Sequence, residues 1–221
     1  MEKFILDTNV FFNIEAGFNL GKNTNETMSC FIYYAKKLMK KVEFYMPPLI
    51  VDEFLSFFKD KNQPIIKETL SFIKVKTPEK NKIKFSAPVF YSLINDVRKR
   101  SYQGLNLGEE LIKKTGLLFL EIEKKLNKKE FEIQIGSLIK NFRERYRQIT
   151  RFGFLDSVAD LDLIVLTKEN DGYLVSADEG VITWGRVFGV KEMPPRIFRA
   201  KLDGLLQSQK EDGKTSQQSY Q

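Results

Sequence analysis

The chain has 221 residues and is 42% hydrophobic, enough to bury the core of one domain with a large insertion or of two small domains. It contains no histidine, which excludes Ser-His-Asp and Cys-His catalysis and histidine-ligated metals, and its one cysteine, Cys30, cannot form an internal disulfide. Since no apolar run approaches the roughly 18 residues that cross a bilayer and no signal peptide is evident, we expect a cytoplasmic protein without a membrane partner.

The formal net charge of +7 comes from the middle of the chain. Residues 84–151 hold 15 basic and 8 acidic residues, so they carry the whole excess, and the remainder has 21 of each. A basic segment beside an acidic site is typical of a protein that holds a phosphate backbone with cations and acts on it elsewhere.

Three short apolar runs in the first half of the chain predict strands, at residues 3–6, 42–46 and 73–76. Asp7 directly follows the first run, so its carboxylate is expected at the carboxyl end of a strand, where α/β proteins form their clefts. Thr8 and Asn9 come next, and they either cap the following helix or bond to a metal-bound water.

The Pro47-Pro48 pair opens a helix after the second predicted strand, and Glu53 lies in it. Apolar residues at helical spacing predict that one side of this helix is buried. Glu53 therefore either faces the mouth of the cleft or is an ordinary exposed helical residue.

Residues 84–150 are expected to form a helical insertion between the two halves of the sheet. Helices are predicted from residue 86 to about 100, from 106 to 125 and from 131 to 150, with a break at 127–129. Six basic residues on the first and last of these helices are candidate contacts to a phosphate backbone: Arg98, Lys99, Arg100, Arg143, Arg147 and Arg151. The last three recur every fourth residue, which is equally typical of the solvated face of a helix.

Four carboxylates of the stretch 154–189 are candidate site residues, placed around an apolar run and a short strand: Asp156, Asp160, Asp162 and Asp178. Asp156 and Asp160 are four residues apart and share a helix face, whereas Asp162 is rotated by about 200° from Asp160 and points away. The helix is expected to end near residues 170–172, and a strand over 173–176 then places Asp178 at its carboxyl end. Carboxylates gathered in this way, without histidine or cysteine, favour Mg²⁺ or Mn²⁺.

A helix over residues 179–188 and an edge strand at 190–191 complete the predicted sheet. The predicted fold is an α/β domain, formed by residues 1–83 and 151–206, with a central and mainly parallel sheet flanked by helices. Residues 84–150 form the inserted helical subdomain, and the polar residues 207–221 predict a disordered tail.

The order of acids along the chain resembles that of the PIN nuclease domain, with Asp7 after a strand, Glu53 on the second helix, Asp160 at a helix start and Asp178 after a strand. The resemblance lies in FILDTN, MPPLIVDEF and DLDLIVLTKENDGYLVSADEG. The stretches FYMP, FRERYRQITRFGFLDSVADLDL and YLVSADEGVITWG closely resemble the HARP family (homologues of Aquifex RNase P), the minimal protein-only RNase P of prokaryotes. This likeness covers almost the whole chain except the tail.

The resemblance implies a PIN-like fold and a metal-dependent endoribonuclease. Such an enzyme removes the 5′ leader of precursor tRNA, leaves a 5′ phosphate, and requires no RNA subunit or second protein. The residues implied to bind Mg²⁺ (or Mn²⁺) and to act in catalysis are Asp7, Asp156, Asp160 and Asp178. Supporting roles are implied for Asp162, Glu53, Thr8 and Asn9. The insertion would bind tRNA, with Arg143 and Arg147 matching basic residues of the family, and would build a homo-oligomer as large as a ring-like or dodecameric assembly.

Three other functions are compatible with parts of the sequence. A PIN-type nuclease could act on other RNA, and a non-catalytic RNA-binding assembly module would share the basic insertion but need no metal. A phosphohydrolase with Asp7 as nucleophile is disfavoured, because FILDTN lacks the second aspartate two residues on that would serve as acid and base.

Overall fold

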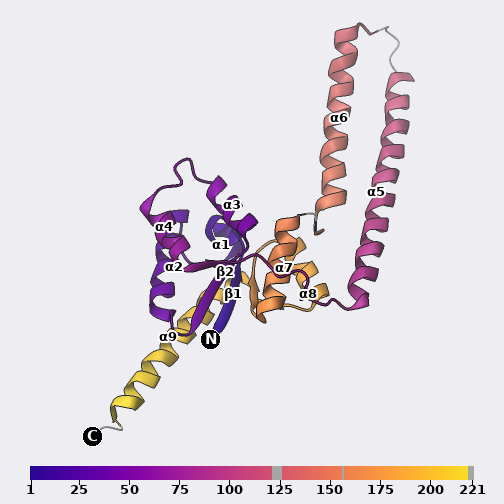
Figure 1. Cartoon of the computed structure of the whole chain (residues 1–221). Helices are drawn as coiled ribbons and strands as arrows, with labels where there is room; N and C mark the ends of the chain where they lie inside the picture. The colour runs from indigo at the N-terminus through magenta and orange to yellow at the C-terminus, as the bar shows by residue number, and fades with distance from the viewer. Residues whose placement is uncertain (121–125, 156, 219–221) are drawn as a thin grey trace. The chain divides into compact units, whose positions relative to one another are not determined.

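The computed structural model describes residues 1–120, 126–155 and 157–218 of the chain (Figure 1). The chain divides into two compact units. The sheet unit consists of Met1–Phe85 and Leu155–Gln221, and the helical unit consists of Ser86–Phe154. The boundaries predicted from the sequence, 84 and 150, lie within a few residues of these.

Within the described residues of the sheet unit, five strands form one sheet in the order β3-β2-β1-β4-β5. The strands are β1 (Glu2–Leu6), β2 (Val42–Met46), β3 (Ile73–Val75), β4 (Tyr173–Val175) and β5 (Lys191–Glu192). Every neighbouring pair is parallel, with Phe4 opposite Phe44 on one side and opposite Tyr173 on the other. The end of β1 is completely buried, as expected for a parallel sheet with helices on both faces. The predicted fold class is confirmed.

Helices cover both faces of this sheet. On the Phe4 and Phe44 face lie α2 (Thr24–Leu38) and α9 (Pro195–Gln218), since the rings of Phe31 and Phe198 contact those of Phe44 and Phe4. On the other face lie α7 (Val158–Asn170) and α8 (Glu179–Phe188), where Gly185 of α8 packs closely against Leu174. The remaining short helices are α1 (Asn9–Phe12), η1 (Ile14–Ala16), α3 (Pro48–Ser56) and α4 (Pro64–Ser71).

The turn between α7 and β4 brings the second half of the chain against β1. Asp171 ends α7 in the left-handed conformation, with φ of 48°. A Cβ on the next residue, Gly172, would lie 2.6 Å from Cδ1 of Ile5 and 2.8 Å from the carbonyl oxygen of Lys3. Only glycine allows this approach, which sets β4 beside β1.

The helical unit is an antiparallel pair, α5 (Ala87–Leu120) and α6 (Lys128–Arg151). The sequence predicted two helices in place of α5, and this was wrong. The helix continues through residues 101–105 because Gly104 acts as a packing residue, not a breaker: a Cβ there would lie 2.9 Å from the ring of Tyr146. The predicted break at 127–129 is where α6 begins, with Asn127 and Glu130 forming a reciprocal capping box.

The last helix, α9, differs from the prediction for the tail. The composition predicts disorder from residue 207, whereas the described backbone remains helical to Gln218. The helix is anchored upstream by Phe198 and Leu202, which are fully buried, and no proline interrupts it after Pro195. In the described part of the chain, no helix combines the length and apolar character that crossing a bilayer requires.

Candidate active site at the carboxyl edge of the sheet

The order of the strands in the sheet reverses at β1, the central strand. From β1 the chain continues to β2 and β3 on one side, whereas β4 and β5 lie on the opposite side of β1. The carboxyl ends of β1 and β4 thus flank the point at which the strand order reverses, where open α/β sheets bind their ligands. Polar residues follow both strands here, Asp7 after β1 and Ser176 after β4, and the Asp7 amide donates to the carbonyl of Val175 over 3.0 Å.

The carboxylate of Asp7 is only 4% exposed and is surrounded by hydrogen-bond donors. Its Oδ2 accepts from Nδ2 of Asn9 at 2.7 Å and from the hydroxyl of Ser176 at 2.5 Å. Burial raises the pKa of Asp7, and hydrogen bonds from Ser176, Asn9 and Thr8 partly oppose that rise. The site therefore holds a carboxylate that is oriented but poorly solvated.

Thr8 connects Asp7 to a second carboxylate, Glu53 of α3. The Thr8 hydroxyl lies 3.3 Å from Oδ1 of Asp7 and 3.2 Å from Oε1 of Glu53, so its single proton serves both oxygens. Burial and the nearby charge of Asp7 raise the pKa of Glu53. Two of the four predicted supporting residues, Thr8 and Asn9, thus hydrogen-bond Asp7 directly, and a third, Glu53, lies close enough to be affected by its charge.

Asp178 begins α8 and is held by the helix that it caps. Its Oδ1 accepts the amide proton of Val181 at 2.9 Å, while its own amide donates to the hydroxyl of Ser176 at 3.0 Å. The Asp178 side chain is exposed and therefore accessible to a substrate or ion. The predicted place of Asp178 after β4 agrees with this geometry.

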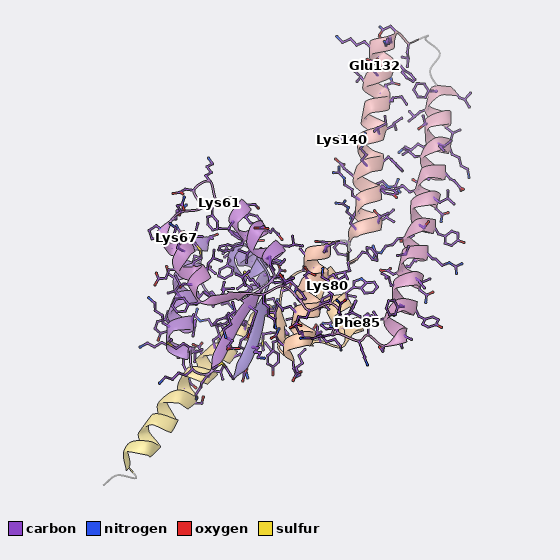
Figure 2. The ribbon with its side chains drawn as sticks, viewed as in Figure 1. Lys61, Lys67, Lys80, Phe85, Glu132 and Lys140 are labelled. Atoms are coloured by element: carbon purple, nitrogen blue, oxygen red, sulfur yellow. The ribbon has the colours of Figure 1, made fainter. Side chains whose placement is uncertain are left out.

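The three acids near the start of α7 differ in their surroundings. Asp160 is half-buried in the first turn of α7, whose N-terminus is capped by Ser157. Asp162 is buried, and its Oδ1 lies 3.2 Å from Nζ of Lys80, which belongs to the segment after β3 and is labelled in Figure 2. Asp156 lies outside the residues that the structure describes.

Among the described residues, no three acidic, cysteine or histidine side chains gather closely enough to form a metal centre. One of the four predicted ligands, Asp156, falls outside that set. The residues that are described fit a divalent cation in their chemistry: every ligand offers hard oxygen atoms, and the carboxylates of Asp7 and Glu53 approach the same Thr8 hydroxyl. The four-carboxylate metal site remains a prediction.

The six predicted basic contacts lie in the helical unit. Arg143, Arg147 and Arg151 are exposed on α6, on sides turned away from the residues that contact α5. Lys140, labelled in Figure 2, also points away from α5. Arg145, on the side that faces α5, instead forms two hydrogen bonds of 2.9 Å with Glu110. The three exposed arginines form a basic stripe on α6, which Glu144 interrupts by pairing with Lys140 at 4.0 Å.

Of the three predicted contacts on α5, Arg98 and Lys99 are exposed and Arg100 is not. The Arg100 guanidinium donates to the carbonyls of Ile149 at 3.2 Å and Phe152 at 2.9 Å, and it lies 4.9 Å from the centre of the Phe154 ring. Its contacts hold the end of α6, so it is poorly placed to contact a substrate.

Two polar residues with roles at or near the site were missed in the sequence. Ser176 joins Asp7 to the Asp178 backbone, and Lys80 neutralises Asp162. A serine two residues before a helix-capping aspartate is the only signal that the sequence offered for the first. Lys80 carried no signal, since it lies far from Asp162 in the chain.

The chain matches the profile of PINc domain ribonucleases over residues 3–207. It therefore belongs to the PINc domain ribonuclease family, in agreement with the parallel sheet and the acids at its carboxyl edge. It is 38% identical over 206 residues to the RNA-free ribonuclease P of Thermococcus kodakarensis, an alignment that covers 93% of this chain and 96% of the relative. The corresponding protein of Pyrococcus furiosus is 37% identical over 207 residues, with coverage of 94% and 96%. That of Pyrococcus horikoshii is 35% identical, with coverage of 94% for both. Within the PINc class, this chain belongs to the RNA-free ribonuclease P family, as the sequence resemblance indicated.

Proposed function

We propose that this protein is an RNA-free ribonuclease P, an endoribonuclease that removes the 5′ leader of precursor tRNA without an RNA or second protein subunit. The observation that carries the proposal is the convergence of Asp7, Ser176 and Asp178 at the switch point of the sheet. This occurs in a chain that aligns over more than nine-tenths of its length with proteins named for that activity.

The proposed cation is Mg²⁺, with Mn²⁺ as a substitute, held by Asp7, Asp160, Asp178 and Asp156. When bound, such an ion lowers the pKa of the attacking water and offsets charge on the leaving oxygen. The chain itself orients these ligands: Asn9 and Ser176 hold Oδ2 of Asp7, and the α8 N-terminus holds Asp178. Water attacks the phosphorus, the bond to the 3′ oxygen of the leader breaks, and the mature tRNA retains a 5′ phosphate.

The basic face of α6 is the proposed contact for the RNA backbone. Arg143, Arg147 and Arg151 are spaced one helical turn apart, and Lys140 extends the row. Arg98 and Lys99 of α5 add two further exposed cations. Arginine and lysine contacts to phosphates supply affinity without reading sequence, which suits an enzyme that must accept many precursor tRNAs.

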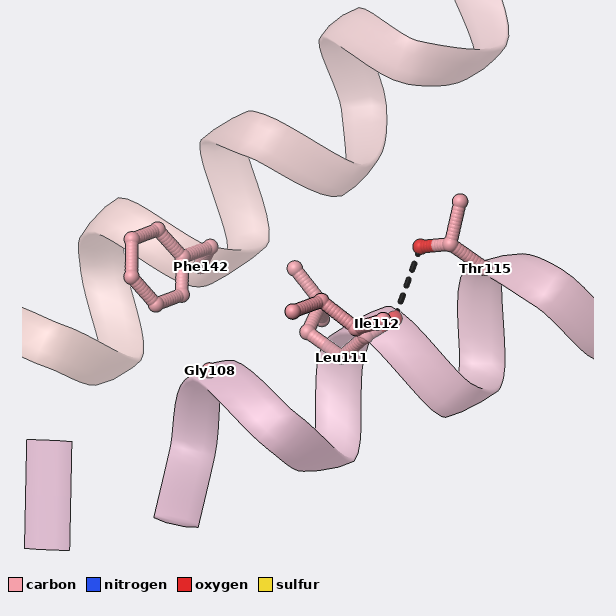
Figure 3. A pocket seen from close by; sticks show the side chains of 5 residues that line it. All are labelled: Gly108, Leu111, Ile112, Thr115 and Phe142. Carbon is pink, nitrogen blue, oxygen red and sulfur yellow. Dashed lines mark hydrogen bonds between the residues drawn. The ribbon is translucent and has the colours of Figure 1, made fainter. Parts of the chain in front are cut away.

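The helical unit is also the proposed site of homo-oligomer formation. Exposed apolar residues recur along one face of α5 at Phe90, Ile94, Val97, Leu105 and Ile112. A cavity of about 370 Å³ opens beside this face, lined by Gly108, Leu111, Ile112, Thr115 and Phe142 (Figure 3). An apolar row of this length calls for a protein partner in water, and a second copy supplies a matching row. A closed ring, up to a dodecamer, is the proposed assembly.

One assay tests the proposed reaction. Purified protein is incubated with end-labelled precursor tRNA and Mg²⁺, and the cut is mapped. We expect a product that begins at the mature 5′ end and carries a phosphate, and we expect EDTA to abolish cleavage and added Mg²⁺ to restore it. Cleavage confined to other RNAs in a total-RNA digest would identify a different ribonuclease, and no cleavage at any Mg²⁺ concentration would indicate a non-catalytic RNA-binding module.

Two substitutions test the site within this assay. Asp7→Asn and Asp178→Asn should each reduce kcat at least a hundredfold while precursor binding persists, because each removes a ligand charge and keeps the side-chain volume. The matched control is Asp171→Asn, since Asp171 is an exposed residue at the far end of α7 paired with Lys191. Undiminished turnover in both site variants would exclude this edge of the sheet as the active site.

A further inference from the structure

The hydroxyl of Ser176 lies between the two strand ends that form the site. It is 2.5 Å from Oδ2 of Asp7 and 3.0 Å from the amide nitrogen of Asp178, and Ser176 is 1% exposed. The buried hydroxyl oxygen of Ser176 thus contacts the side chain of Asp7 and the backbone of Asp178.

The direction of both hydrogen bonds is determined by their partners. The Asp178 amide can only donate, so Ser176 accepts from it. The single hydroxyl proton is then available for the Asp7 carboxylate, which accepts. The Ser176 hydroxyl therefore donates one hydrogen bond and accepts another within the site, and both partners are the aspartates Asp7 and Asp178.

These contacts leave the two oxygens of Asp7 in different states. Oδ2 receives the short bonds from Asn9 and Ser176, whereas Oδ1 receives a longer contact of 3.3 Å from the Thr8 hydroxyl, which also faces Glu53. Oδ1, the less tightly bonded oxygen, is the one better placed to accept a further ligand. A rotation of the Asp7 carboxyl would break both short bonds, so Ser176 and Asn9 hold Oδ1 in one orientation.

We propose that Ser176 is a positioning residue that sets the Asp7 carboxylate and the Asp178 backbone in register for one divalent cation. It contacts neither the substrate nor the reacting atoms. The proposal rests on the proposed function, in which Asp7 and Asp178 bind the cation, and it adds the group that makes the two strand ends act together. Groups that orient metal ligands in this way commonly change metal affinity or activity by about 10-fold to 100-fold when they are removed.

Two substitutions separate hydrogen bonding from packing. Ser176→Ala removes the hydroxyl, while Ser176→Cys keeps a side chain of similar volume but replaces a strong donor with a weak one. A role in positioning predicts that both variants are impaired, whereas a role in packing predicts that only the alanine variant is. The matched control is Thr69→Val, which removes another buried hydroxyl, one that bonds to the Ile65 carbonyl in α4.

The first readout is binding of Mn²⁺ alone, without RNA, measured by electron paramagnetic resonance of the free ion. We expect both Ser176 variants to bind Mn²⁺ about tenfold more weakly or worse than wild type and Thr69→Val to bind normally. Wild-type binding by both variants, or a wild type that binds no Mn²⁺, would overturn the proposal.

The second readout is the Mg²⁺ dependence of precursor cleavage. The half-saturating Mg²⁺ concentration should rise about tenfold or more in both variants, kcat should fall, and KM for precursor at saturating Mg²⁺ should stay within about twofold of wild type, because RNA contacts are unchanged. A rise in KM alone would contradict the positioning role. If wild type binds Mn²⁺ but cleaves no precursor tRNA, the proposed function fails, while the first readout still decides the role of Ser176.

Discussion

The buried carboxylate of Asp7 gives the site a stability that depends on pH. Burial is the largest cause of its raised pKa, so the folded state prefers the neutral form. Between the ordinary pKa of an aspartate, about 3.9, and the raised value, the folded protein binds more protons than the unfolded chain. The contribution of Asp7 to stability is therefore greatest in acid and is lost as the pH rises through the raised pKa.

This sign leads to a prediction for Asp7→Asn in EDTA. The amide keeps the size of the side chain and carries no charge, so at pH 7 to 8 the variant should melt at a higher temperature than wild type. The difference should shrink as the pH falls through the raised pKa and Asp7 becomes protonated. Calorimetry of both proteins across this range measures it. A wild type that gains stability relative to the variant as pH rises would contradict the pKa direction.

At the residue scale, the sequence predicted some positions in the site and could not predict others. Asp7 and Asp178 were predicted because an acid after an apolar strand has a definite place at the sheet edge. Ser176 was not, because one hydroxyl after a strand is compatible with an ordinary turn until its partner is known. That partner, Asp7, is 169 residues away, and no local pattern reports such a contact.

At the scale of elements, the recurrence of Arg143, Arg147 and Arg151 every fourth residue predicted that they share one stripe of α6, and all three are exposed. The same reasoning divided α5 in two. A glycine in a helix lowers helical propensity, but the ring of Tyr146 against Gly104 shows that packing outweighs propensity there. Arg100 was likewise predicted to be a surface contact for RNA. Its true partners are backbone carbonyls at the end of α6, 49 and 52 residues away, and no sequence pattern reveals such contacts.

The two faces of α6 provide a controlled test of RNA binding. Arg143→Ala with Arg147→Ala should weaken binding of precursor tRNA and should reduce the slope of log affinity against log salt by about 1 per arginine, because fewer counterions are released. Arg145→Ala is the control, since its guanidinium is engaged by Glu110 on the same helix pair. Fluorescence anisotropy across a salt series, with catalysis stopped by EDTA, measures both quantities. Equal slopes for the double variant and the control would exclude the face as a phosphate contact.

At the scale of the whole molecule, the apolar row on α5 makes a prediction about assembly. Leu105 and Ile112 are 58% and 75% exposed, so glutamate at both positions should cost little in the isolated chain. In an oligomer joined through this row, the same charges would be buried without partners, and the assembly should dissociate. Light scattering should show wild type as an oligomer and Leu105→Glu with Ile112→Glu as a smaller species.

The matched control for assembly is Ile197→Glu, which places the same charge on an exposed apolar residue of the sheet unit. It should leave the mass of the oligomer unchanged. A wild type that is monomeric and fully active would remove the assembly proposal while leaving the nuclease assignment intact.

The pairing of β1 with β4 also determines at which point of synthesis the proposed active site can form. Asp7 is made early, but the serine and aspartate that complete its surroundings are made about 170 residues later, after both long helices. A growing polypeptide can form β1, β2 and β3 as it emerges. At that stage it contains Asp7 and Glu53 but not Ser176 or Asp178, so the site is incomplete. We therefore expect that translation that stops before Ser176 releases a fragment without nuclease activity. Because of this topology, the proposed site can be catalytically competent only after β4 has joined the sheet.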